Sequence, residues 1–436
     1  MKKIIRTSLL IICLGSIVLI GKSKWIEFCD RPARDRYSHP FYKKSVHFVR
    51  KALGVAPFAA VHYALANSYL DEGLVNQAVE EYKKTLQMDK RFVQAYLALG
   101  DIYFGRASYK EALELLQQAE AVVSGNPALK ELKRRVSFEY FRDEGVKSFG
   151  KGDPIKARDL LKGALEADQN SAQVHYLIAL SFDEQRDFNR VEDHLRKAIS
   201  LDPKYYLARS FLGDLYFGKG DFEAAIEQYQ SSLAIYGENP AVLNNLGLAY
   251  MNLESYYLAM LSLEKAVALD PGNVGFRYNL AAVCRDFGEL EKAAKGFIIV
   301  IRINPGYPSV HNDLGDIYRK QGRNSEAFKE FRATIEQGQK RISKNISDPL
   351  LLVELAYAYN EIKELDKAEK LVNQALRLDP TEQRAYLILA SIYRSTNRYE
   401  AALAELEKAK KTSSRKYFYI DEAIEETQKQ MAHSRR

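Results

Sequence analysis

The segment Pro240–Asn273, PAVLNNLGLAYMNLESYYLAMLSLEKAVALDPGN, decides the fold because the chain repeats its pattern. The 34 residues that follow keep its small residues in place, since Gly247 corresponds to Ala281 and Ala259 to Ala293. A fixed period of this length predicts a solenoid, in which each unit buries its apolar face only by stacking on its neighbours.

Three series of residues extend this period into ten units that start at residue 59. A small residue occupies the eighth position of each unit: Ala66, Gly100, Gly145, Ala179, Gly213, Gly247, Ala281, Gly315, Ala356 and Ala390. Twelve residues later comes Ala78, Ala112, Ala157, Val191, Ala225, Ala259, Ala293, Ala327, Ala368 or Ala402. An aromatic residue, usually tyrosine, follows the first series by three residues, as in Tyr69, Tyr103, Tyr216, Tyr250, Tyr318, Tyr359 and Tyr393.

Each unit contains two separate runs of apolar residues at helical spacing. In the quoted segment the first run includes Leu243, Leu246 and Tyr250, and the second includes Leu263 and Val267. This pattern predicts two amphipathic helices joined by a few polar residues. The small residues let the two helix axes approach closely where they cross, and a proline after the second run ends the unit because it has no N–H to donate.

These motifs resemble the tetratricopeptide repeat, and the resemblance covers about 340 residues in ten units. It implies an all-α fold, a right-handed α-solenoid of about ten helix–turn–helix repeats. It also implies that the first helices of the repeats line a concave wall, which is where this family binds peptides.

Residues 1–24 have the pattern of a targeting or anchoring segment. Lys2, Lys3 and Arg6 precede an apolar run from Leu9 to Ile20, which fits either a secretory signal or a short membrane anchor. We favour an uncleaved signal-anchor, as in a membrane-anchored repeat protein of bacterial type. A short basic tail usually stays in the cytoplasm, so the repeats are expected on the other side, in the periplasm.

The expected organisation has five parts: the anchor at 1–24, a basic linker with an N-terminal capping helix at 25–58, repeats one and two at 59–126, repeats three to ten at 127–416, and a C-terminal capping helix with a tail at 417–436. Eleven extra residues, Pro127–Ser137, either lengthen the first helix of the third unit or separate two repeats from the main array. Seven extra residues, Ile342–Asp348, are expected to extend the helix before them.

The net charge of +7 lies mainly at the two ends of the chain. Residues 1–36 carry +5 and residues 407–436 carry +3, which leaves −1 for the repeats between them. A solenoid that binds nucleic acid is expected to carry its basic excess along the repeats. We therefore expect no nucleic-acid partner.

The sequence contains no catalytic, metal or cofactor motif that holds. The segment Gly145–Lys151 is similar to a phosphate-binding loop, but Gly152 stands where Ser or Thr must bind magnesium. His62, His175 and His311 each occupy the fourth position of a unit, where packing is the expected role. Three cysteines are too few and too scattered for a disulfide framework or a zinc site. We therefore expect a protein that is not an enzyme and has no cofactor.

Units six to eight place polar residues where the resemblance implies a peptide-binding groove. The candidate groove residues are Asn244, Asn245, Asn252, Tyr278, Asn279, Arg285, Asn312, Asp316 and Arg319. An asparagine amide both donates and accepts, so a row of amides can pair with the backbone of an extended peptide. Asn245 and Asn279 resemble the asparagine ladder of sugar-transferring relatives, although Asp313 interrupts the row. The alternative is that these asparagines cap or pair with neighbouring helices.

Two further features bear on the choice of ligand. The Lys/Asn clamp by which some tetratricopeptide proteins hold a C-terminal carboxylate is not matched, because Tyr63 lies beside Asn67 and Asp101 follows in the next unit. A second patch is acidic and aromatic, and is expected to suit a basic or amphipathic ligand; it consists of Tyr176, Asp183, Glu184, Asp214 and Phe217.

The sequence thus predicts a membrane-associated scaffold or adaptor that binds peptide segments of partner proteins in its concave groove. The alternative is a non-catalytic accessory subunit of an envelope polysaccharide or glycosyl-transfer system. The partner and the oligomeric state are not encoded in any motif that we recognise.

Overall fold

The computed structural model describes residues 59–307, 309–342, 348–412 and 418–434. Within these ranges every helix or strand is an α-helix, and the helices form ten successive pairs followed by one last helix. The expected anchor at 1–24 and the linker with its capping helix at 25–58 lie outside the described residues. Over the described ranges, no helix combines the length and the apolar character that a membrane span requires.

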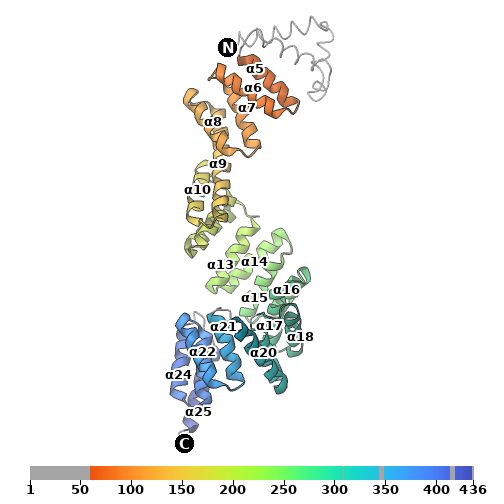
Figure 1. The fold of residues 1–436 in the computed structure, drawn as a ribbon, viewed down its shortest axis with the longest axis vertical. Coiled ribbons are helices and arrows are strands. Elements are labelled where there is room, and N and C mark those ends of the chain that lie inside the picture. The colour runs from red at the N-terminus through yellow and green to blue at the C-terminus, as the bar shows by residue number, and fades with distance from the viewer. Residues whose placement is uncertain (1–58, 308, 343–347, 413–417, 435–436) are drawn as a thin grey trace. The chain divides into compact units, whose positions relative to one another are not determined.

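The chain divides into two compact units, of which the first ends at Asp202 and the second begins at Pro203. The first unit contains four helix pairs, drawn in orange to yellow-green in Figure 1. Their bounds are α5 Ala59–Asp71, α6 Val75–Met88, α7 Val93–Gly105, α8 Tyr109–Val122, α9 Pro127–Gly150, α10 Pro154–Ala167, α11 Ala172–Asp183 and α12 Phe188–Leu201.

The second unit contains six helix pairs and the final helix, drawn in green to blue in Figure 1. The pairs are α13 Tyr206–Lys219 and α14 Phe222–Tyr236, α15 Pro240–Asn252 and α16 Tyr256–Leu269, α17 Val274–Phe287 and α18 Leu290–Ile303, α19 Val310–Lys320 and α20 Asn324–Ile342, α21 Pro349–Glu361 and α22 Leu365–Leu378, and α23 Gln383–Ser395 and α24 Tyr399–Thr412. The final helix is α25, Phe418–Ser434.

Short polar side chains and prolines start many of these helices. The Asn239 side chain accepts hydrogen bonds from the backbone N–H groups of Ala241 and Val242, while Pro240 occupies the first helical position of α15. The N-cap side chain thereby satisfies donors that the first turn leaves unpaired, and proline loses nothing there because its missing N–H has no partner in the helix. Asn126 and Asp348 cap α9 and α21 in the same way.

The turn between the two helices contains a residue of positive φ at the same place in all ten repeats. The fifteenth residue of each repeat has a positive φ; these residues are Gly73, Ala107, Gly152, Arg186, Gly220, Glu254, Gly288, Gly322, Lys363 and Asn397. Half of these residues are glycine, which adopts this left-handed conformation without steric cost. The other half are held there by the turn, at a cost of about 1–2 kcal/mol each for a residue with a side chain.

The two small positions lie at the helix crossings, as the sequence predicts. Gly247 faces Leu263, sixteen residues later, so closely that a Cβ added to Gly247 would lie 2.6 Å from the Leu263 Cγ. Gly213 meets Tyr229 and Gly315 meets Phe331 in the same register. The alanines of the second series, Ala259 among them, are fully buried or nearly so in all ten repeats, apart from the valine at the one exceptional position, which is also buried.

Within the second unit, the first helices of successive repeats pack directly on one another. α15 contacts both α13 and α17, and α21 contacts both α19 and α23, while each second helix packs against the first helix of its own repeat and that of the next. The first helices are therefore the more closely spaced layer, and their row forms the inner wall of this unit. The prediction of an all-α solenoid of tetratricopeptide-like repeats is confirmed.

The described residues cover the irregular segments only in part. The extra residues before the third repeat form the first turns of α9, which is 24 residues long and buries Leu129, Leu132 and Val136. α20 extends to Ile342, and residues 343–347 lie outside the described ranges. The final helix α25 packs on α24 and covers the end of the array, with Ile420 only 1% exposed.

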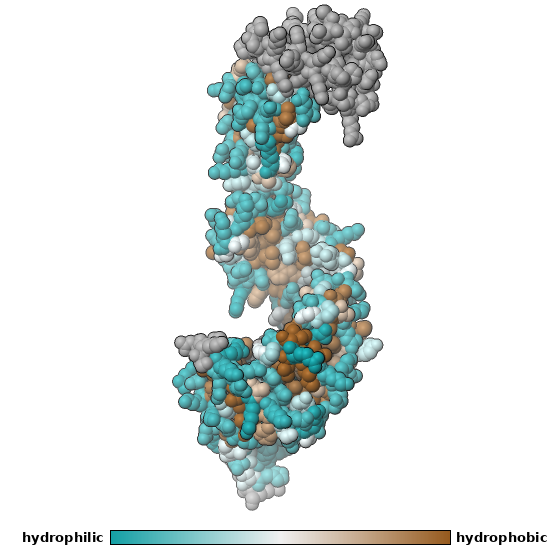
Figure 2. All heavy atoms as spheres, turned by 45° about the vertical axis from the view of Figure 1, so that its right-hand side comes forward, coloured by the Kyte–Doolittle hydropathy of each residue, from teal (hydrophilic) through white to brown (hydrophobic). Residues whose placement is uncertain are grey.

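The face drawn in Figure 2 is mostly polar, with apolar patches between the polar side chains. In the second unit, one helix, α16, exposes three large apolar side chains: Tyr257, Leu258 and Leu261 are 70%, 42% and 43% exposed. On the inner wall, polar side chains contact one another across repeats.

Candidate functional site: a polar network along the inner wall

One contact recurs along the inner wall of the second unit and joins repeats six to nine, each to the next. The residue at position five of a first helix bonds to position six of the following first helix. Two of these pairs, Asn244–Asn279 and Tyr278–Asp313, are separated by 35 residues. A third, Asn312–Glu354, is separated by 42, which is the same register after the seven extra residues between the eighth and ninth repeats.

The asparagines on α15 and α17 form a continuous hydrogen-bonded chain. Asn279 Nδ2 donates to Asn244 Oδ1 at 2.8 Å, and Asn244 Nδ2 donates to Asn245 Oδ1 at 3.1 Å. Asn245 Nδ2 in turn donates to Asp214 Oδ1 on α13 at 2.9 Å, and Tyr229 donates its O–H to the same oxygen at 2.7 Å. These bonds correspond to the alternative expectation, in which the asparagines pair with neighbouring helices.

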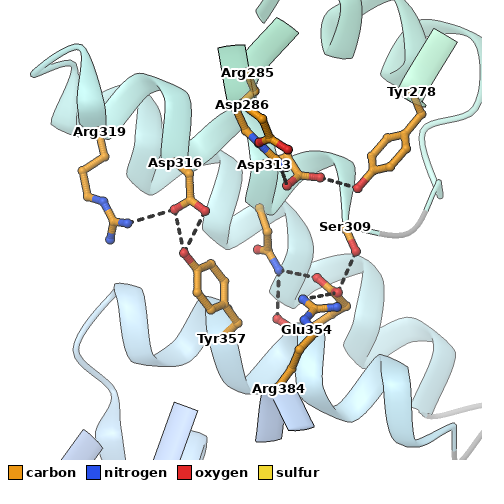
Figure 3. A network of polar contacts seen from close by, with 11 residues as sticks. Tyr278, Arg285, Asp286, Ser309, Asp313, Asp316, Arg319, Glu354, Tyr357 and Arg384 are labelled. Carbon is orange, nitrogen blue, oxygen red and sulfur yellow. Dashed lines mark hydrogen bonds and ion pairs between the residues drawn. The ribbon is translucent and has the colours of Figure 1, made fainter. Parts of the chain in front are cut away.

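The aspartate that interrupts the asparagine row keeps the same contact with different chemistry. The Tyr278 hydroxyl donates to Asp313 Oδ2 at 2.6 Å, and Arg285 donates to the other carboxylate oxygen of Asp313. Arg285 also bonds Asp286 at 2.8 Å, so two carboxylates share one guanidinium (Figure 3). A carboxylate can therefore replace an amide at this position, because the two groups that face it, a phenol and a guanidinium, are both donors.

Glu354 of α21 is the centre of the next group. It is only 6% exposed and accepts hydrogen bonds from Ser309 Oγ at 2.6 Å and from Asn312 Nδ2 at 2.8 Å. Arg384 of α23 forms an ion pair with the same carboxylate at 2.7 Å (Figure 3). A buried carboxylate is stable only when its oxygens are paired and hydrogen-bonded, and these three donors meet that condition.

A third group joins α19 to α21 one helical turn further along. The Tyr357 hydroxyl lies 2.7 and 2.8 Å from the two oxygens of Asp316, and Arg319 bonds the same carboxylate at 3.0 Å. Arg319 also forms an ion pair with Glu361. Here again two carboxylates share one guanidinium, which leaves the group with an excess of negative charge.

Burial sets the protonation behaviour of these groups. It raises the pKa of Asp313 and of Asp316, against the opposing effect of their arginine and tyrosine partners. Burial and the adjacent carboxylates together raise the pKa of Tyr278 and Tyr357, so both phenols keep their protons and act as donors. Burial disfavours the charge of Arg285, but Asp313 and Asp286 outweigh it and raise the arginine's pKa.

A pocket opens on the inner wall between α19, α21 and α23. It has a volume of about 270 Å³, and its lining includes four carboxylates and one arginine. The carboxylates are those of Asp313, Asp316, Glu354 and Glu361, and the arginine is Arg384. Leu387 and Ile388 of α23 form an apolar side of the pocket.

The structure places eight of the nine predicted groove residues in this network. Asn252 is the exception, because its Nδ2 donates to the backbone carbonyl of Leu248 in its own helix at 2.8 Å. Five further residues of this site were not predicted from the sequence, and all of them lie in repeats nine and ten: Glu354, Tyr357, Asn360, Glu361 and Arg384. Position five of one repeat bonds position six of the next. Once the seven inserted residues are allowed for, this rule could have identified Glu354 from the sequence. The role of the predicted residues in binding stays a prediction.

The predicted histidines form cross-helix pairs at a constant separation of nineteen residues. His62 bonds Glu81 at 2.5 Å, His175 bonds His194 at 3.0 Å and His311 bonds Glu330 at 2.6 Å. These contacts join the two helices of one repeat. In the part of the chain that the structure describes, no group of three or more His, Cys, Asp or Glu side chains is arranged to hold a metal ion.

The second predicted patch combines residues of both units. Tyr176, Asp183 and Glu184 belong to the first unit, whereas Asp214 and Phe217 belong to the second. Asp214 is engaged by Asn245 and Tyr229, as described above. A common ligand for this set stays a prediction.

The fold and the inner wall define an α-solenoid of helical repeats. A family model described as the Cilia and flagella-associated protein 70 C-terminal domain matches residues 202–432, more than half of the chain. Models of the tetratricopeptide repeat match residues 63–127 and 172–205. The chain therefore belongs to the tetratricopeptide-repeat family whose model carries the description Cilia and flagella-associated protein 70 C-terminal domain.

Curated relatives are longer proteins that share part of their length with this chain. Human protein O-mannosyl-transferase TMTC1 is 27% identical over 209 residues, covering 47% of this chain and 23% of the relative. The BBSome complex member BBS4 of Bos taurus is 22% identical over 235 residues, covering 53% and 45%. The chain thus spans less than half the length of either relative. Among solved structures, yeast Tom70 aligns with 90% of this chain and 93% of its own, at 18% identity and a TM-score of 0.46.

Proposed function

We propose that the chain is a non-enzymatic scaffold whose inner wall binds extended peptide segments of partner proteins. The observation that carries this proposal is the recurring bond between position five of one repeat and position six of the next. It fixes polar side chains in a row before any partner arrives. A ligand that meets side chains already held in place loses less conformational entropy on binding, which favours recognition of a flexible segment.

The proposed groove residues keep capacity for a ligand beyond their mutual contacts. An asparagine has two N–H donors and an acceptor oxygen with two lone pairs. The chain from Asn279 to Asn244 to Asn245 uses one N–H of each amide. An extended peptide backbone presents alternating N–H and C=O groups along its length, so it matches such a row independently of its side chains.

Membership of a larger assembly is part of the proposal. The family to which the chain belongs and its similarity to a named BBSome complex member support a role in assembling proteins. The basic and apolar pattern of residues 1–24 supports a membrane-associated complex, with the repeats outside the cytoplasm. A reporter fused to the C-terminus tests this placement, and a cytoplasmic signal would contradict it.

The test of the groove uses peptides of random sequence. A displayed library of 12-residue peptides is selected on the purified chain, and the selected peptides are measured against Asn245→Ala combined with Asn279→Ala. We expect this variant to weaken binding at least tenfold, since each amide bond contributes about 1 kcal/mol. The control combines Gln118→Ala with Asn373→Ala, two exposed amides on the second helices α8 and α22. Unchanged binding by the groove variant, or an equal loss in the control, would contradict the assignment.

A second candidate function is an accessory role in glycosyl transfer. The similarity to two proteins named protein O-mannosyl-transferase, TMTC1 and TMTC3, favours it. In this case the groove would guide a polymer or an enzyme while the chain itself performs no chemistry. Retention of the chain on mannan-coated beads, with no retention of the groove variant, would support this candidate over peptide binding.

A further inference from the structure

One residue that lines the pocket between α19, α21 and α23 has a buried acceptor atom that no described hydrogen bond uses. Asn360 lines the pocket and is only 3% exposed. Its Nδ2 lies 3.3 Å from both Glu361 Oε1 and Ser391 Oγ. In the described ranges, its Oδ1 is one of only two buried side-chain oxygens or nitrogens that have no hydrogen-bond partner; the other belongs to Glu405. A buried acceptor without a partner destabilises the protein, so a donor that reaches this atom is favoured.

The orientation of the Asn360 amide follows from its neighbours. The nitrogen faces the carboxylate of Glu361, which can only accept a hydrogen bond when ionised. Reversing the amide would place its oxygen against that carboxylate oxygen at the same 3.3 Å, which is repulsive. The unused atom in the pocket is therefore an acceptor, and the group that satisfies it must be a donor.

The charges around the pocket favour a cationic donor. Arg319 is shared by Asp316 and Glu361, and Arg285 is shared by Asp313 and Asp286, so each of these two groups carries one negative charge in excess when its carboxylates are ionised. The remaining carboxylate, Glu354, is balanced by Arg384. Nearby negative charge in a site of low dielectric stabilises a cation and disfavours an anion.

The shape of the pocket suits a long side chain. Its volume of about 270 Å³ lies below the usual range for a whole drug-sized ligand. Leu387 and Ile388 offer an apolar wall beside the polar groups. Lysine and arginine combine an aliphatic stem with a charged, donating head, and they bury the stem while the head stays with polar partners.

We propose that this pocket binds a basic side chain, lysine or arginine, of the peptide segment that lies in the groove. The charged head donates to Asn360 Oδ1 and lies near Glu361 and Asp316, and the stem packs along Leu387 and Ile388. The inference rests on the proposed function, because it assigns one specificity pocket within the same inner wall. It adds the sequence preference that a row of backbone-binding amides does not supply.

The test uses the 12-residue peptides selected on the wild-type chain. Each lysine in a selected peptide is replaced by norleucine, and each arginine by citrulline, and the dissociation constants are measured. We expect one basic position at which the replacement weakens binding at least tenfold, equivalent to about 1.4 kcal/mol. On Glu361→Gln the same replacement is expected to cost less than threefold, because the pocket has lost the excess charge that lies beside Asn360. Glu336→Gln is the matched control, since Glu336 on α20 is exposed and paired only with its helix neighbour Lys340 in the contacts described.

The outcomes separate the inference from the proposed function. Peptides that lose affinity for the asparagine variant but have no sensitive basic position would overturn the pocket and leave the groove standing. A sensitive position that is unchanged by Glu361→Gln would also overturn the pocket. Failure to select any peptide would contradict both.

A second measurement does not require a peptide. Ser391→Lys supplies a cation within the pocket, whereas Ser391→Met supplies an apolar chain of similar length beside Asn360. We expect the lysine variant to unfold at a higher temperature than the methionine variant, and expect this difference to vanish when Glu361→Gln is added to both. A lysine variant that is less stable than the methionine variant would overturn the inference.

Discussion

Asn279 on α17 donates a 2.8 Å hydrogen bond to Asn244 on α15, 35 residues earlier in the chain. Asn244 is only 8% exposed, so this bond lies largely out of water. The repeat length is 34 residues, and the bond therefore advances one position beyond the period. The same advance joins Tyr278 to Asp313, which shows that the contact belongs to the stacking of the repeats and does not depend on asparagine.

Removing the donor of this bond is expected to loosen the junction between repeats six and seven. Asn279→Ala leaves the buried Oδ1 of Asn244 without this partner, and we expect a loss of about 1 kcal/mol in stability. Because repeats interact only with their neighbours, the effect is expected in α15 to α18 and not in α5 to α8. Amide hydrogen exchange resolves the two regions. Equal acceleration in both, or none in α15 to α18, would contradict the role of the bond.

A methyl group at the closest helix crossing is expected to destabilise its repeat. Gly247→Ala places a Cβ 2.6 Å from Leu263 Cγ and 3.1 Å from the Ala259 carbonyl oxygen. The backbone oxygen cannot move away without shifting α16, so we expect a cost of about 1–3 kcal/mol. Gly218→Ala is the control, since nothing lies within 4 Å of its added Cβ, and alanine there should stabilise α13 by about 0.5–1 kcal/mol. Urea unfolding followed by circular dichroism compares the two; equal midpoints would refute the packing argument.

The sequence was sufficient to predict the repeats because their determinants are local and periodic. Gly247 and Ala259 had to be small wherever two helices cross, and the prediction that they are wedged between helices is confirmed by their burial. Pro240 and Pro127 mark helix starts that the structure shows at the same residues. Each of these features depends on residues within one repeat.

The contacts of the inner wall could be predicted only in part, because they join side chains of different repeats. Sequence placed Asn245 and Asn279 on one wall, but their separation of 34 residues gave no indication that each bonds a different partner, Asp214 and Asn244. The acidic pocket was missed because repeats nine and ten have apolar residues where repeats six to eight have asparagine or tyrosine. Val353 and Leu387 occupy position five there. The charged groups of these two repeats come instead from positions six, thirteen and two, which are Glu354, Glu361 and Arg384.

Glycine is expected to stabilise the protein where it replaces a residue that has a positive φ in a turn. Ala107 has φ of 55° in the turn between α7 and α8 and is exposed, so its side chain contributes little packing. Ala107→Gly removes a steric cost of about 1–2 kcal/mol, offset by the greater freedom of glycine in the unfolded chain, about 0.5–1 kcal/mol. We expect a net gain of about 0.5–1 kcal/mol in urea unfolding. Ala112→Gly, in the buried face of α8, should instead destabilise; a loss in both variants would show that the turn carries no strain.

Removing one partner of the buried ion pair between Asp313 and Arg285 is expected to destabilise the protein more than removing both partners. Asp313→Asn keeps an acceptor for Tyr278 but leaves Arg285 with Asp286 as its remaining carboxylate partner. We expect a loss of about 2 kcal/mol, typical of a hydrogen bond to a charged group. Adding Arg285→Met removes the half-buried guanidinium that has lost one of its two carboxylate partners, and should restore part of the loss. The double-mutant cycle, measured by thermal unfolding, measures this coupling; strictly additive effects would show that the pair is not coupled.

The histidine pair in the fourth repeat is expected to make the stability of the first unit depend on pH. His175 and His194 approach through their Nδ1 atoms at 3.0 Å, which requires one donor and one acceptor, so a proton on the acceptor breaks the bond. Burial lowers the pKa of His194 to about 4, with a further lowering by His175 and Arg190 and an opposing effect of Asp193; burial also lowers the pKa of His175. Because the folded pKa is below that of an unfolded histidine, about 6.5, the neutral pair contributes fully above pH 6.5.

That contribution is lost as the pH falls from about 6.5 towards 4, because the unfolded chain then binds more protons than the folded one. We therefore expect His194→Gln, which keeps a side chain able to donate and accept, to show a smaller drop in melting temperature than wild type between pH 7.5 and pH 5. Carboxylates elsewhere titrate alike in both proteins and cancel in the comparison. His433→Gln, an exposed histidine on α25, serves as the matched control and should follow wild type. A drop of equal size in the His194 variant would mean that the pair titrates as in an unfolded chain and contributes nothing to the fold.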